Sequence, residues 1–363
     1  MCRQNRDDML FGLRTIPEVR CRDMFCLGIM DTQMEEIIIM EKKFDVTALG
    51  ELLIDFTQNG LSEQGNPLFE ANPGGAPCNV LSMLSRLGRK TAFIGKVGND
   101  GFGKQLTAAI EEVGINAEGL LYDDEVHTTL ALVHTLEGGD RDFSFYRNPG
   151  ADVNLNKDEL PEHLIREAKI FHYGTLSLTD EPVKSATEKA VAIAEECGLI
   201  RSFDPNLRPP LWKSLDDAKV AVDWGLQHCD VLKISDNEIT WFTGLDDYDE
   251  GIRYLQEHYP DIKLICLSMG PDGSRAYCGS IRVEVKPFLQ KETIETTGAG
   301  DTFGACVIDG VLREGLDGLN EENLKEILTF ANAAASIVTT KKGALRVMPD
   351  RAAVEAFIAG FKG

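Results

Sequence analysis

The residues best suited to chemistry lie near the C-terminus, in the segment TIETTGAGDTFGACVIDGVLREG, residues 293–315. A β-like run enters a Gly-Ala-Gly turn at 298–300, and an amphipathic helical pattern follows it. Glycine lets the backbone approach a ligand closely, and the free amides of a helix's first turn attract an anion. Asp301 stands at this helix start, where a carboxylate would repel a phosphate group. The pattern indicates either a helix cap or a base that takes a proton from a hydroxyl group beside a phosphate.

A second segment, VGNDGFGKQL at 97–106, has the opening of a phosphate-binding P-loop. It matches G-x-x-x-x-G-K from Gly98 to Lys104, but a P-loop then needs a Ser or Thr hydroxyl for magnesium, and here Gln105 follows. Asp100 is well placed to cap a helix. We therefore predict an ordinary helix start here and not a nucleotide site.

Strands that alternate with helices must position these residues. Buried strands are predicted at 44–50, 91–98, 169–174, 199–206, 230–235 and 263–270. Helical spacing predicts helices at 77–88 and 101–114. This alternation predicts an α/β fold in which helices cover both faces of a mostly parallel central sheet.

Two segments interrupt the alternation, at 52–60 and 128–147, and have the pattern of antiparallel strands with a Glu-Gly-Gly-Asp hairpin turn. We expect them to form a small β-sheet lid, built from about 52–72 and 128–150. The main domain is expected at 44–363. Residues 1–43 lack the apolar core of a signal peptide and are interpreted as a non-essential N-terminal extension.

The composition excludes several classes of function. Acidic residues outnumber basic ones by 59 to 37, for a formal net charge of −22, which disfavours nucleic-acid binding. Nine dispersed cysteines without C-x-x-C pairs are typical of reduced thiols in the cytoplasm. No segment approaches the roughly 18 apolar residues of a membrane helix, and no G-x-G-x-x-G follows the first strand. We therefore predict a cytoplasmic protein that binds neither nucleic acid nor membrane and is not a dinucleotide-dependent oxidoreductase.

Two motifs resemble those of the ribokinase-like (PfkB) family of carbohydrate kinases. GAGDTFGA at 298–305 resembles the C-terminal motif of that family. The N-terminal motif GGxxxNxAxxLxxLGxxxxxIGxVGxDxxG is matched from Gly74 to Gly103, with Leu81 in place of a small Ala. Phrases such as GELLIDF at 50–56 and SFDPNLRPPLW at 202–212 are most similar to bacterial and plant fructokinases. The resemblance covers roughly residues 44–363.

The resemblance implies a ribokinase-like fold and the ATP-dependent phosphorylation of a sugar's primary hydroxyl, with D-fructose converted to fructose 6-phosphate. Asp301 would be the general base, and the amides of Gly298, Ala299 and Gly300 the anion hole. The implied sugar ligands are Asp55, Gly74, Gly75, Asn79 and Arg147. The implied nucleotide ligands are Ser268, Gly270, Gly273, Asn332 and Gly343. Glu238 would help to hold Mg²⁺ through water, while a monovalent cation such as K⁺ and a homodimer through the lid are left open.

Most of these residues also have a purely structural interpretation. Gly74 and Gly75 are compatible with a simple turn, Arg147 with a solvated strand position, and Asn332 with a bridge inside a helix. Asp204, Asn206 and Arg208 are expected to order a strand-end turn, although the family places this segment near the phosphates, and His172 is expected to be a buried, hydrogen-bonded histidine.

Two positions depart from the family pattern. Glu295 replaces the Asp that opens the C-terminal motif, so we expect altered packing or ion coordination there. Ser235 replaces the Asn of an N-x-x-E motif, which weakens the inference about magnesium. Two alternatives remain: a kinase of the same family for ribose or 2-keto-3-deoxygluconate, and a catalytically silent sugar-binding or scaffold protein. The intact Asp301 argues against the silent protein.

Overall fold

The computed structural model describes residues 42–135 and 141–361. The predicted hairpin turn at 137–140 and nearly all of the predicted extension 1–43 lie outside these residues. Across the described part of the chain, every helix is too short or too polar to cross a lipid bilayer.

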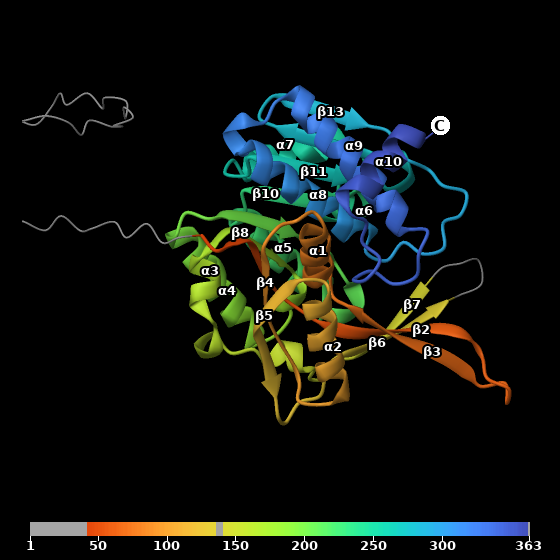
Figure 1. The fold of residues 1–363 in the computed structure, drawn as a ribbon. Coiled ribbons are helices and arrows are strands. Elements are labelled where there is room, and N and C mark those ends of the chain that lie inside the picture. The colour runs from red at the N-terminus through yellow and green to blue at the C-terminus, as the bar shows by residue number, and fades with distance from the viewer. Residues whose placement is uncertain (1–41, 136–140, 362–363) are drawn as a thin grey trace, which may run out of the picture. The chain divides into compact units, whose positions relative to one another are not determined.

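A nine-stranded sheet forms the centre of the fold (Figure 1), in the order β13-β12-β11-β10-β9-β8-β1-β4-β5. Its strands are β1 (Phe44–Leu49), β4 (Thr91–Gly98), β5 (Ile115–Asp123), β8 (Ala168–Gly174), β9 (Ile200–Asp204), β10 (Val231–Ser235), β11 (Leu264–Ser268), β12 (Ser274–Cys278) and β13 (Ile281–Val285). β12 is antiparallel to both of its neighbours, β11 and β13, and all other neighbouring strands are parallel. The predicted mostly parallel sheet is confirmed.

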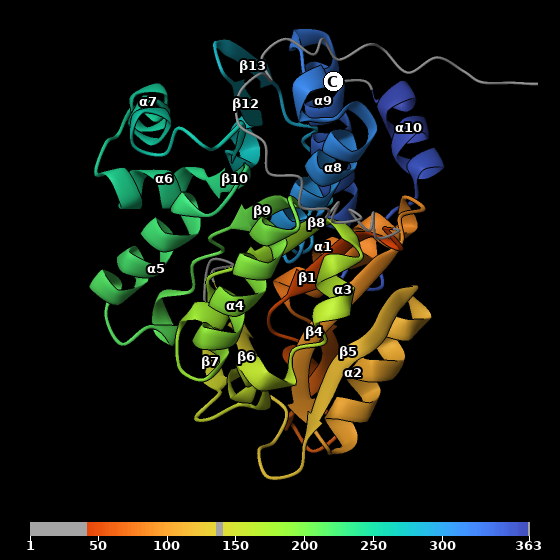
Figure 2. The same ribbon diagram turned by 90° about the vertical axis from the view of Figure 1, so that its left-hand side faces the viewer.

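Helices cover both faces of this sheet, as the alternation predicts. One face packs against α1 (Ala76–Arg86), α2 (Gly101–Glu112), α8 (Ala299–Glu314) and α9 (Glu321–Val338), with α10 (Arg351–Gly360) on α9. The other packs against α3 (Glu162–Arg166), α4 (Val183–Glu196), α5 (Leu215–Gln227), α6 (Asp236–Thr243) and α7 (Tyr248–His258), which Figure 2 shows together. Successive residues of β8 show why: Ile170 belongs to the first core and Phe171 to the second, because strand side chains alternate between faces.

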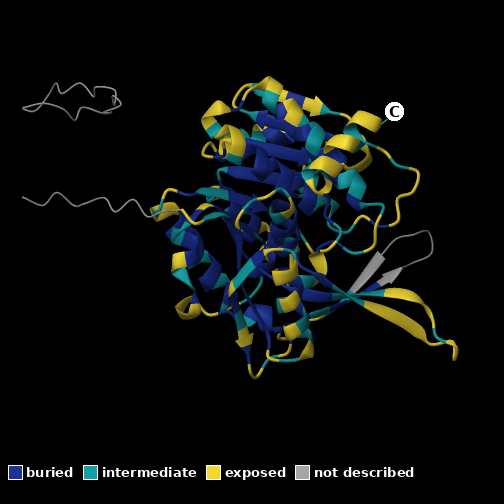
Figure 3. Ribbon diagram, in the orientation of Figure 1, coloured by how far each residue is buried: buried dark blue, intermediate teal, exposed yellow. Residues whose placement is uncertain are grey.

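Burial follows the same layers. In Figure 3 the central strands are buried, and exposed residues lie on the outward sides of the helices and along the second sheet. Strands buried on both faces read as continuous apolar runs, which is why the strand predictions for this sheet are close to the observed bounds.

The start of α2 settles the P-loop question. Asp100 Oδ1 accepts a hydrogen bond from the Gly103 amide at 2.8 Å, and Asp100 Oδ2 accepts one from the Thr128 amide at 2.9 Å. The carboxylate occupies the helix start that a phosphate would need. The prediction of a capped helix is confirmed.

A second sheet of four strands stands apart from the first, in the order β3-β2-β6-β7. Its strands are β2 (Leu53–Leu61), β3 (Pro67–Gly74), β6 (Leu130–Thr135) and β7 (Arg141–Tyr146). The predicted smaller sheet is therefore present, and we call it the small sheet. The expectation of purely antiparallel pairing is wrong, because β2 pairs in parallel with β6. β2 pairs with β3, and β6 with β7, in the antiparallel sense, but β2 and β6 meet only after the chain has passed through the main sheet.

Candidate active site

Polar side chains gather where the parallel strands end. Glu51 follows β1, Asp204 ends β9, Ser235 ends β10, and Ser268 ends β11. In open α/β sheets the carboxyl ends of the strands form the usual ligand-binding crevice. The N-terminus of α8, with Asp301 in its first turn, meets the same edge of the sheet.

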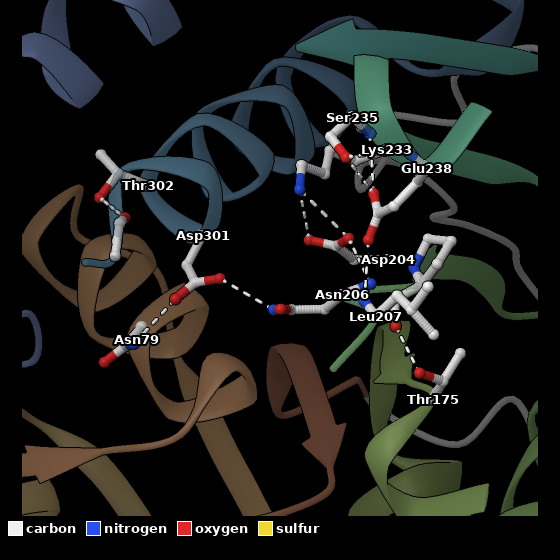
Figure 4. A network of polar contacts seen from close by, with 12 residues as sticks. Asn79, Thr175, Asp204, Asn206, Leu207, Lys233, Ser235, Glu238, Asp301 and Thr302 are labelled. Atoms are coloured by element: carbon white, nitrogen blue, oxygen red, sulfur yellow. Dashed lines mark hydrogen bonds and ion pairs between the residues drawn. The ribbon is translucent and has the colours of Figure 1, made fainter. Parts of the chain in front are cut away.

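Asp301 is buried and held by two amide side chains (Figure 4). Asn79 Nδ2 donates to Asp301 Oδ2 at 2.7 Å, and Asn206 Nδ2 donates to Asp301 Oδ1 at 3.3 Å. Amide donors orient a carboxylate without neutralising it. Asp301 is therefore presented as a fixed, buried hydrogen-bond acceptor.

Burial raises the pKa of Asp301 above that of an ordinary aspartate. The hydrogen bond from Asn79 and the positive charges of Lys233 and Arg208 act in the opposite direction. Asp55 lies close enough for its charge to interact with that of Asp301, and burial raises the pKa of Asp55 to about 7. A base needs a pKa near the working pH, which this combination of burial and partners favours.

The first turn of α8 has the features of an anion site. Its N-cap residue, Gly298, has φ of 77°, which a residue with a side chain rarely adopts, and no side chain caps the helix. A Cβ atom at Gly298 would lie 2.6 Å from the Cβ of Ala344. The backbone amides of Ala299 and Gly300 begin the helix, and amides at an uncapped helix start suit a phosphate group.

The residues predicted to bind sugar converge beside Asp301, apart from Arg147. A side chain at Gly74 would clash with the Asp55 carboxylate, and one at Gly75 would clash with the backbone carbonyl of Glu51. Gly75 also has φ of 125° as it starts α1. Asn79 Oδ1 is buried and has no hydrogen-bond partner among the described residues. A ligand hydroxyl would satisfy this atom.

The residues predicted to bind nucleotide form a second group. A side chain at Gly273 would clash with the Val285 carbonyl, and Asn332 Nδ2 donates to that same carbonyl at 3.3 Å. Gly270 has φ of 50° and opens the turn that Gly273 closes. Ser268 pairs in register with Ser235 across β10 and β11.

Gly343 joins the two groups of residues. Its amide donates to Glu295 Oε2 at 3.4 Å, and a Cβ atom at Gly343 would lie 3.4 Å from Asn72 Oδ1 in β3. The departure at Glu295 thus has a packing role: the longer side chain reaches the loop that also contacts Gly298 through Ala344.

Arg147 is held by partners within the protein, and its charge also acts on Glu51. Its Nε donates to Asp152 at 2.7 Å, its Nη1 to Thr179 Oγ1 at 2.9 Å, and its Nη2 to the Leu176 carbonyl at 2.9 Å. All three nitrogens are thus used inside the protein, and the side chain is buried. In this structure Arg147 braces the chain after β7, which the sequence did not reveal because its partners lie up to 32 residues away.

Glu238 is also engaged by the protein. It accepts from the Leu207 amide at 2.8 Å through Oε1 and from the Ser235 hydroxyl at 2.7 Å through Oε2. Ser235 and Glu238 together form the capping box of α6, so the Ser that replaces the family's Asn works as a helix cap. Among residues 42–135 and 141–361, no cluster of three His, Cys, Asp or Glu side chains is arranged to hold a metal ion. Water-mediated magnesium binding by Glu238 stays a prediction.

Sequence reasoning missed Lys233 and Glu51, and it expected Asn206 to order a strand-end turn in a segment that the family places near the phosphates. Lys233 Nζ lies 3.0 Å from Asp204 Oδ2, and Glu51 Oε1 accepts from the Ala76 amide at 2.9 Å. The sequence does show a charged residue within or close to each apolar strand. Lys233 interrupts the apolar run VLKIS, and Glu51 lies two residues after the end of β1. Charged residues are almost never fully buried unless they are paired. His172 is buried beside Ser202 Oγ at 3.1 Å, as expected, and burial lowers its pKa to about 4.

Comparison with known proteins identifies relatives of the whole described fold. The model of the pfkB family carbohydrate kinase matches residues 43–351. Probable fructokinase-4 of Arabidopsis thaliana is 41% identical over 317 residues, which are 87% of this chain and 97% of that protein.

Two solved structures share the fold. Fructokinase with bound ATP from Xylella fastidiosa has a TM-score of 0.79 at 28% identity, covering 87% of this chain and 98% of that one. A fructokinase double mutant from Vibrio cholerae O395, with fructose, ADP and potassium ion bound, has a TM-score of 0.78 at 28% identity, covering 88% of this chain and 99% of that one.

Proposed function

The chain belongs to the pfkB family of carbohydrate kinases, and from this membership we propose that it phosphorylates D-fructose with ATP to give fructose 6-phosphate. The observation that carries the proposal is the buried Asp301 carboxylate, held by two amides in the first turn of an uncapped helix. Base and anion site are thereby adjacent, as phosphoryl transfer to a hydroxyl requires. The fructokinase relatives support fructose as the acceptor.

Asp301 would act as the general base. The carboxylate takes the proton from the primary hydroxyl of the sugar, the hydroxyl oxygen forms a bond to the γ-phosphorus of ATP, and the bond from that phosphorus to the bridging oxygen breaks. ADP leaves with the electron pair of that bond. Asn79 and Asn206 fix the carboxylate during the step, and such positioning is the main contribution that phosphoryl transfer asks of a protein.

The amides at the start of α8 would stabilise the transferred group. Gly298, Ala299 and Gly300 present backbone N–H groups to the charge that develops on the phosphoryl oxygens, and loss of one such donor typically costs ~10²–10³-fold in rate. On the sugar side, Asp55 would accept hydroxyl hydrogen bonds, and the unpartnered Asn79 Oδ1 would accept another. Because Gly74 has no side chain, it leaves the space that the Asp55 carboxylate occupies.

The nucleotide would bind along the second group of residues. Ser268 ends β11, Gly270 and Gly273 form the turn after it, Asn332 lies on α9, and Gly343 lies on the loop after α9. We propose Mg²⁺ as the divalent ion, with Glu238 holding it through water, and a monovalent cation as a further requirement. When bound, Mg²⁺ would neutralise phosphate charge. Relatives with potassium or calcium ion bound support a role for cations.

The small sheet would act as a lid over the sugar, and its edges would form a homodimer contact. β3 and β7 are its edge strands, and residues 67–70 of β3 are all exposed. Unpaired strand edges are ready-made surfaces for association. A cytoplasmic location is also proposed, supported by six described cysteines that are all free thiols.

The proposal is tested by measuring ATP-to-ADP turnover with magnesium against fructose, ribose, glucose, 2-keto-3-deoxygluconate and adenosine. We expect a clear preference for fructose. Turnover of another sugar instead would leave Asp301 as the base and show that the sugar assignment is wrong. Turnover of none, combined with fructose-induced thermal stabilisation, would show a silent sugar-binding protein.

Replacement of the base gives a sharper test. Asp301→Asn keeps the shape of the side chain but removes the proton acceptor, so kcat should fall by ~10²–10⁴-fold while the melting temperature changes little. Kinetics at saturating fructose and ATP, with thermal unfolding as a control for folding, measure both. Near-wild-type turnover in this variant would refute the assignment.

A further inference from the structure

A short turn after β9, Asp204–Leu207, lies between the main sheet and Asp301 (Figure 4). Every residue of this turn is held by a separate contact. Asp204 pairs with Lys233, the Pro205 carbonyl accepts from Thr175 Oγ1 at 2.5 Å, and the Leu207 amide donates to Glu238 at 2.8 Å. A turn tied at so many points has one position relative to the sheet.

Asn206 is the residue that this turn presents to Asp301. Its backbone amide donates to Asp204 Oδ1 at 3.1 Å, while its side-chain Nδ2 donates to Asp301 Oδ1 at 3.3 Å. Its φ is 44°, and it is the one non-glycine residue with positive φ among those described. Asn tolerates this conformation better than most residues, but it is still uncommon and persists where the surroundings enforce it. The contacts around the turn supply that enforcement.

Lys233 is the strongest of the anchors. Its ammonium lies 3.2 Å from Asp204 Oδ1 and 3.0 Å from Asp204 Oδ2, in the middle of the buried strand β10. Burial disfavours a charged lysine, but the carboxylates of Asp204 and Glu238 outweigh this and raise its pKa, so the ammonium form persists. A Cβ atom at Gly300 would lie 3.3 Å from Lys233 Nζ, so the ammonium also lies against the first turn of α8. Lys233 thus touches both the turn that holds Asp301 and the helix that carries it.

We propose that Lys233 is a positioning residue for the proposed phosphoryl transfer: through Asp204 it fixes Asn206, and Asn206 fixes the carboxylate of Asp301. The inference rests on the proposed function, in which Asp301 is the base. Among the described residues, Lys233 makes no hydrogen bond or ion pair with Asp301. Its charge does lower the pKa of that carboxyl, but its effect on the position of the carboxylate must pass through the turn. Loss of the anchor should misplace the base without removing any group that binds ATP or sugar.

The first test compares Lys233→Met with a matched buried lysine. Lys96 of β4 is also buried and pairs with Glu159 Oε1 at 2.9 Å, away from this turn. Since a misplacement of about 1 Å can cost ~10²-fold in rate, we expect kcat of Lys233→Met to fall roughly 10- to 100-fold. The Michaelis constants for fructose and ATP should stay within about threefold, because binding groups are untouched. Lys96→Met should lower the melting temperature and leave kcat unchanged.

The route through Asn206 is tested by a double-mutant cycle. Asn206→Gly adopts a positive φ without strain and removes only the amide that reaches Asp301. If Lys233 acts through Asn206, the double variant Lys233→Met/Asn206→Gly should be no slower than the slower single variant. Losses in kcat that multiply in the double variant would overturn the proposed route.

Lys233→Met leaves Asp204 buried without its counter-charge, so the variant is also made as Lys233→Met/Asp204→Asn, in which neither charge remains. A kcat equal to that of Lys96→Met in this folded variant would overturn the role of Lys233. The outcome is separable from the proposed function, which is tested by Asp301→Asn. If Asp301→Asn loses turnover while Lys233→Met/Asp204→Asn keeps it, Asp301 remains the proposed base and the positioning role of Lys233 is rejected.

Discussion

Glu51 is a buried carboxyl group that anchors the helix carrying Asn79. Its Oε1 accepts from the amide of Ala76, the first residue of α1. Burial raises the pKa of Glu51 to about 7, and the amide hydrogen bond opposes this only partly. The folded protein therefore holds a proton on Glu51 at pH values where the unfolded chain has released it.

This difference predicts the sign of a pH effect on stability. The group binds more protons in the folded state between its ordinary pKa of 4.5 and about 7, so its contribution to the free energy of unfolding is full below 4.5 and is lost as pH rises through about 7. The loss is up to about 3 kcal/mol. Glu51→Gln keeps an acceptor for the Ala76 amide but does not titrate, so its melting temperature should fall less than that of the wild type when the pH is raised from 4.5 to about 7.5.

Thermal unfolding at the two pH values measures the effect. Glu355, an exposed glutamate on α10, provides the control: Glu355→Gln should follow the wild type. An equal fall in melting temperature for wild type and Glu51→Gln would contradict the prediction.

For single residues, the sequence could predict those that belong to motifs but not those that only the fold brings together. Asp301 and Asn79 were predicted from two motifs, and the structure brings them to 2.7 Å across 222 positions. Asn206 was expected to order a strand-end turn in a segment that the family places near the phosphates, but nothing local shows that its side chain reaches a residue 95 positions away. Lys233 was missed because the pairing that permits its burial is made by Asp204, 29 positions away.

Among the elements, α8 carries a second buried carboxylate two turns beyond Asp301. Asp309 is 2% exposed and accepts from Arg89 Nε through Oδ1 and from Arg351 Nη2 through Oδ2, both at 2.7 Å. Arg351 begins α10 and Arg89 precedes β4. The cluster thus ties the middle of α8 to the C-terminal helix and to the main sheet.

Asp309→Asn should therefore affect stability and not chemistry. The change weakens ion pairs whose arginines are partly exposed, so we expect a loss of about 2 kcal/mol and a melting temperature lower by several degrees. The variant is the matched control for Asp301→Asn, since both replace a buried Asp on one helix. Urea unfolding and kcat measure the two effects, and a large fall in kcat with unchanged stability would contradict this division of roles.

The helices and strands also show which parts of the fold can be predicted from local sequence signals. The Gly-rich turn and the helix predicted within 293–315 are found as the start of α8 and α8 itself, because glycine and helical periodicity are local signals. The β-like run predicted before the turn is wrong, since residues 293–297 form no strand. The parallel pairing of β2 with β6 could not be predicted in this way. It brings together strands separated by α1, β4, α2 and β5, and pairing over such distances depends on the whole fold.

For the whole domain, the small sheet is connected to the loop proposed to bind nucleotide. Lys342 Nζ donates to Asn59 Oδ1 of β2 at 3.0 Å, and Gly343 lies beside Asn72 of β3. Glu295 holds the same loop near the start of α8. The small sheet therefore contacts both proposed substrate sites, and a partner that covers its edges would influence both.

Exposed apolar side chains indicate where such a partner would bind. Four of the nine large exposed apolar residues among those described lie on the small sheet: Leu61 at 62%, Leu68 at 47%, Phe69 at 38% and Tyr146 at 62%. Clusters of this kind mark association surfaces more often than single exposed residues do. Together with the unpaired edges of β3 and β7, they favour a second copy of this sheet as the partner.

We therefore expect Leu61→Glu/Phe69→Glu to dissociate a homodimer, because two buried charges would face the partner's apolar residues without a counter-charge. Sedimentation velocity should give twice the 40.0 kDa of one chain for the wild type and a single chain for the variant. Val220→Glu, at an equally exposed apolar position on α5, should remain dimeric.

A wild-type protein that sediments as a monomer would reject the dimer. A dimer that survives both substitutions would show that its interface lies away from the small sheet. If the edges complete the lid, the dissociated variant should also bind fructose more weakly, because β2 carries Asp55.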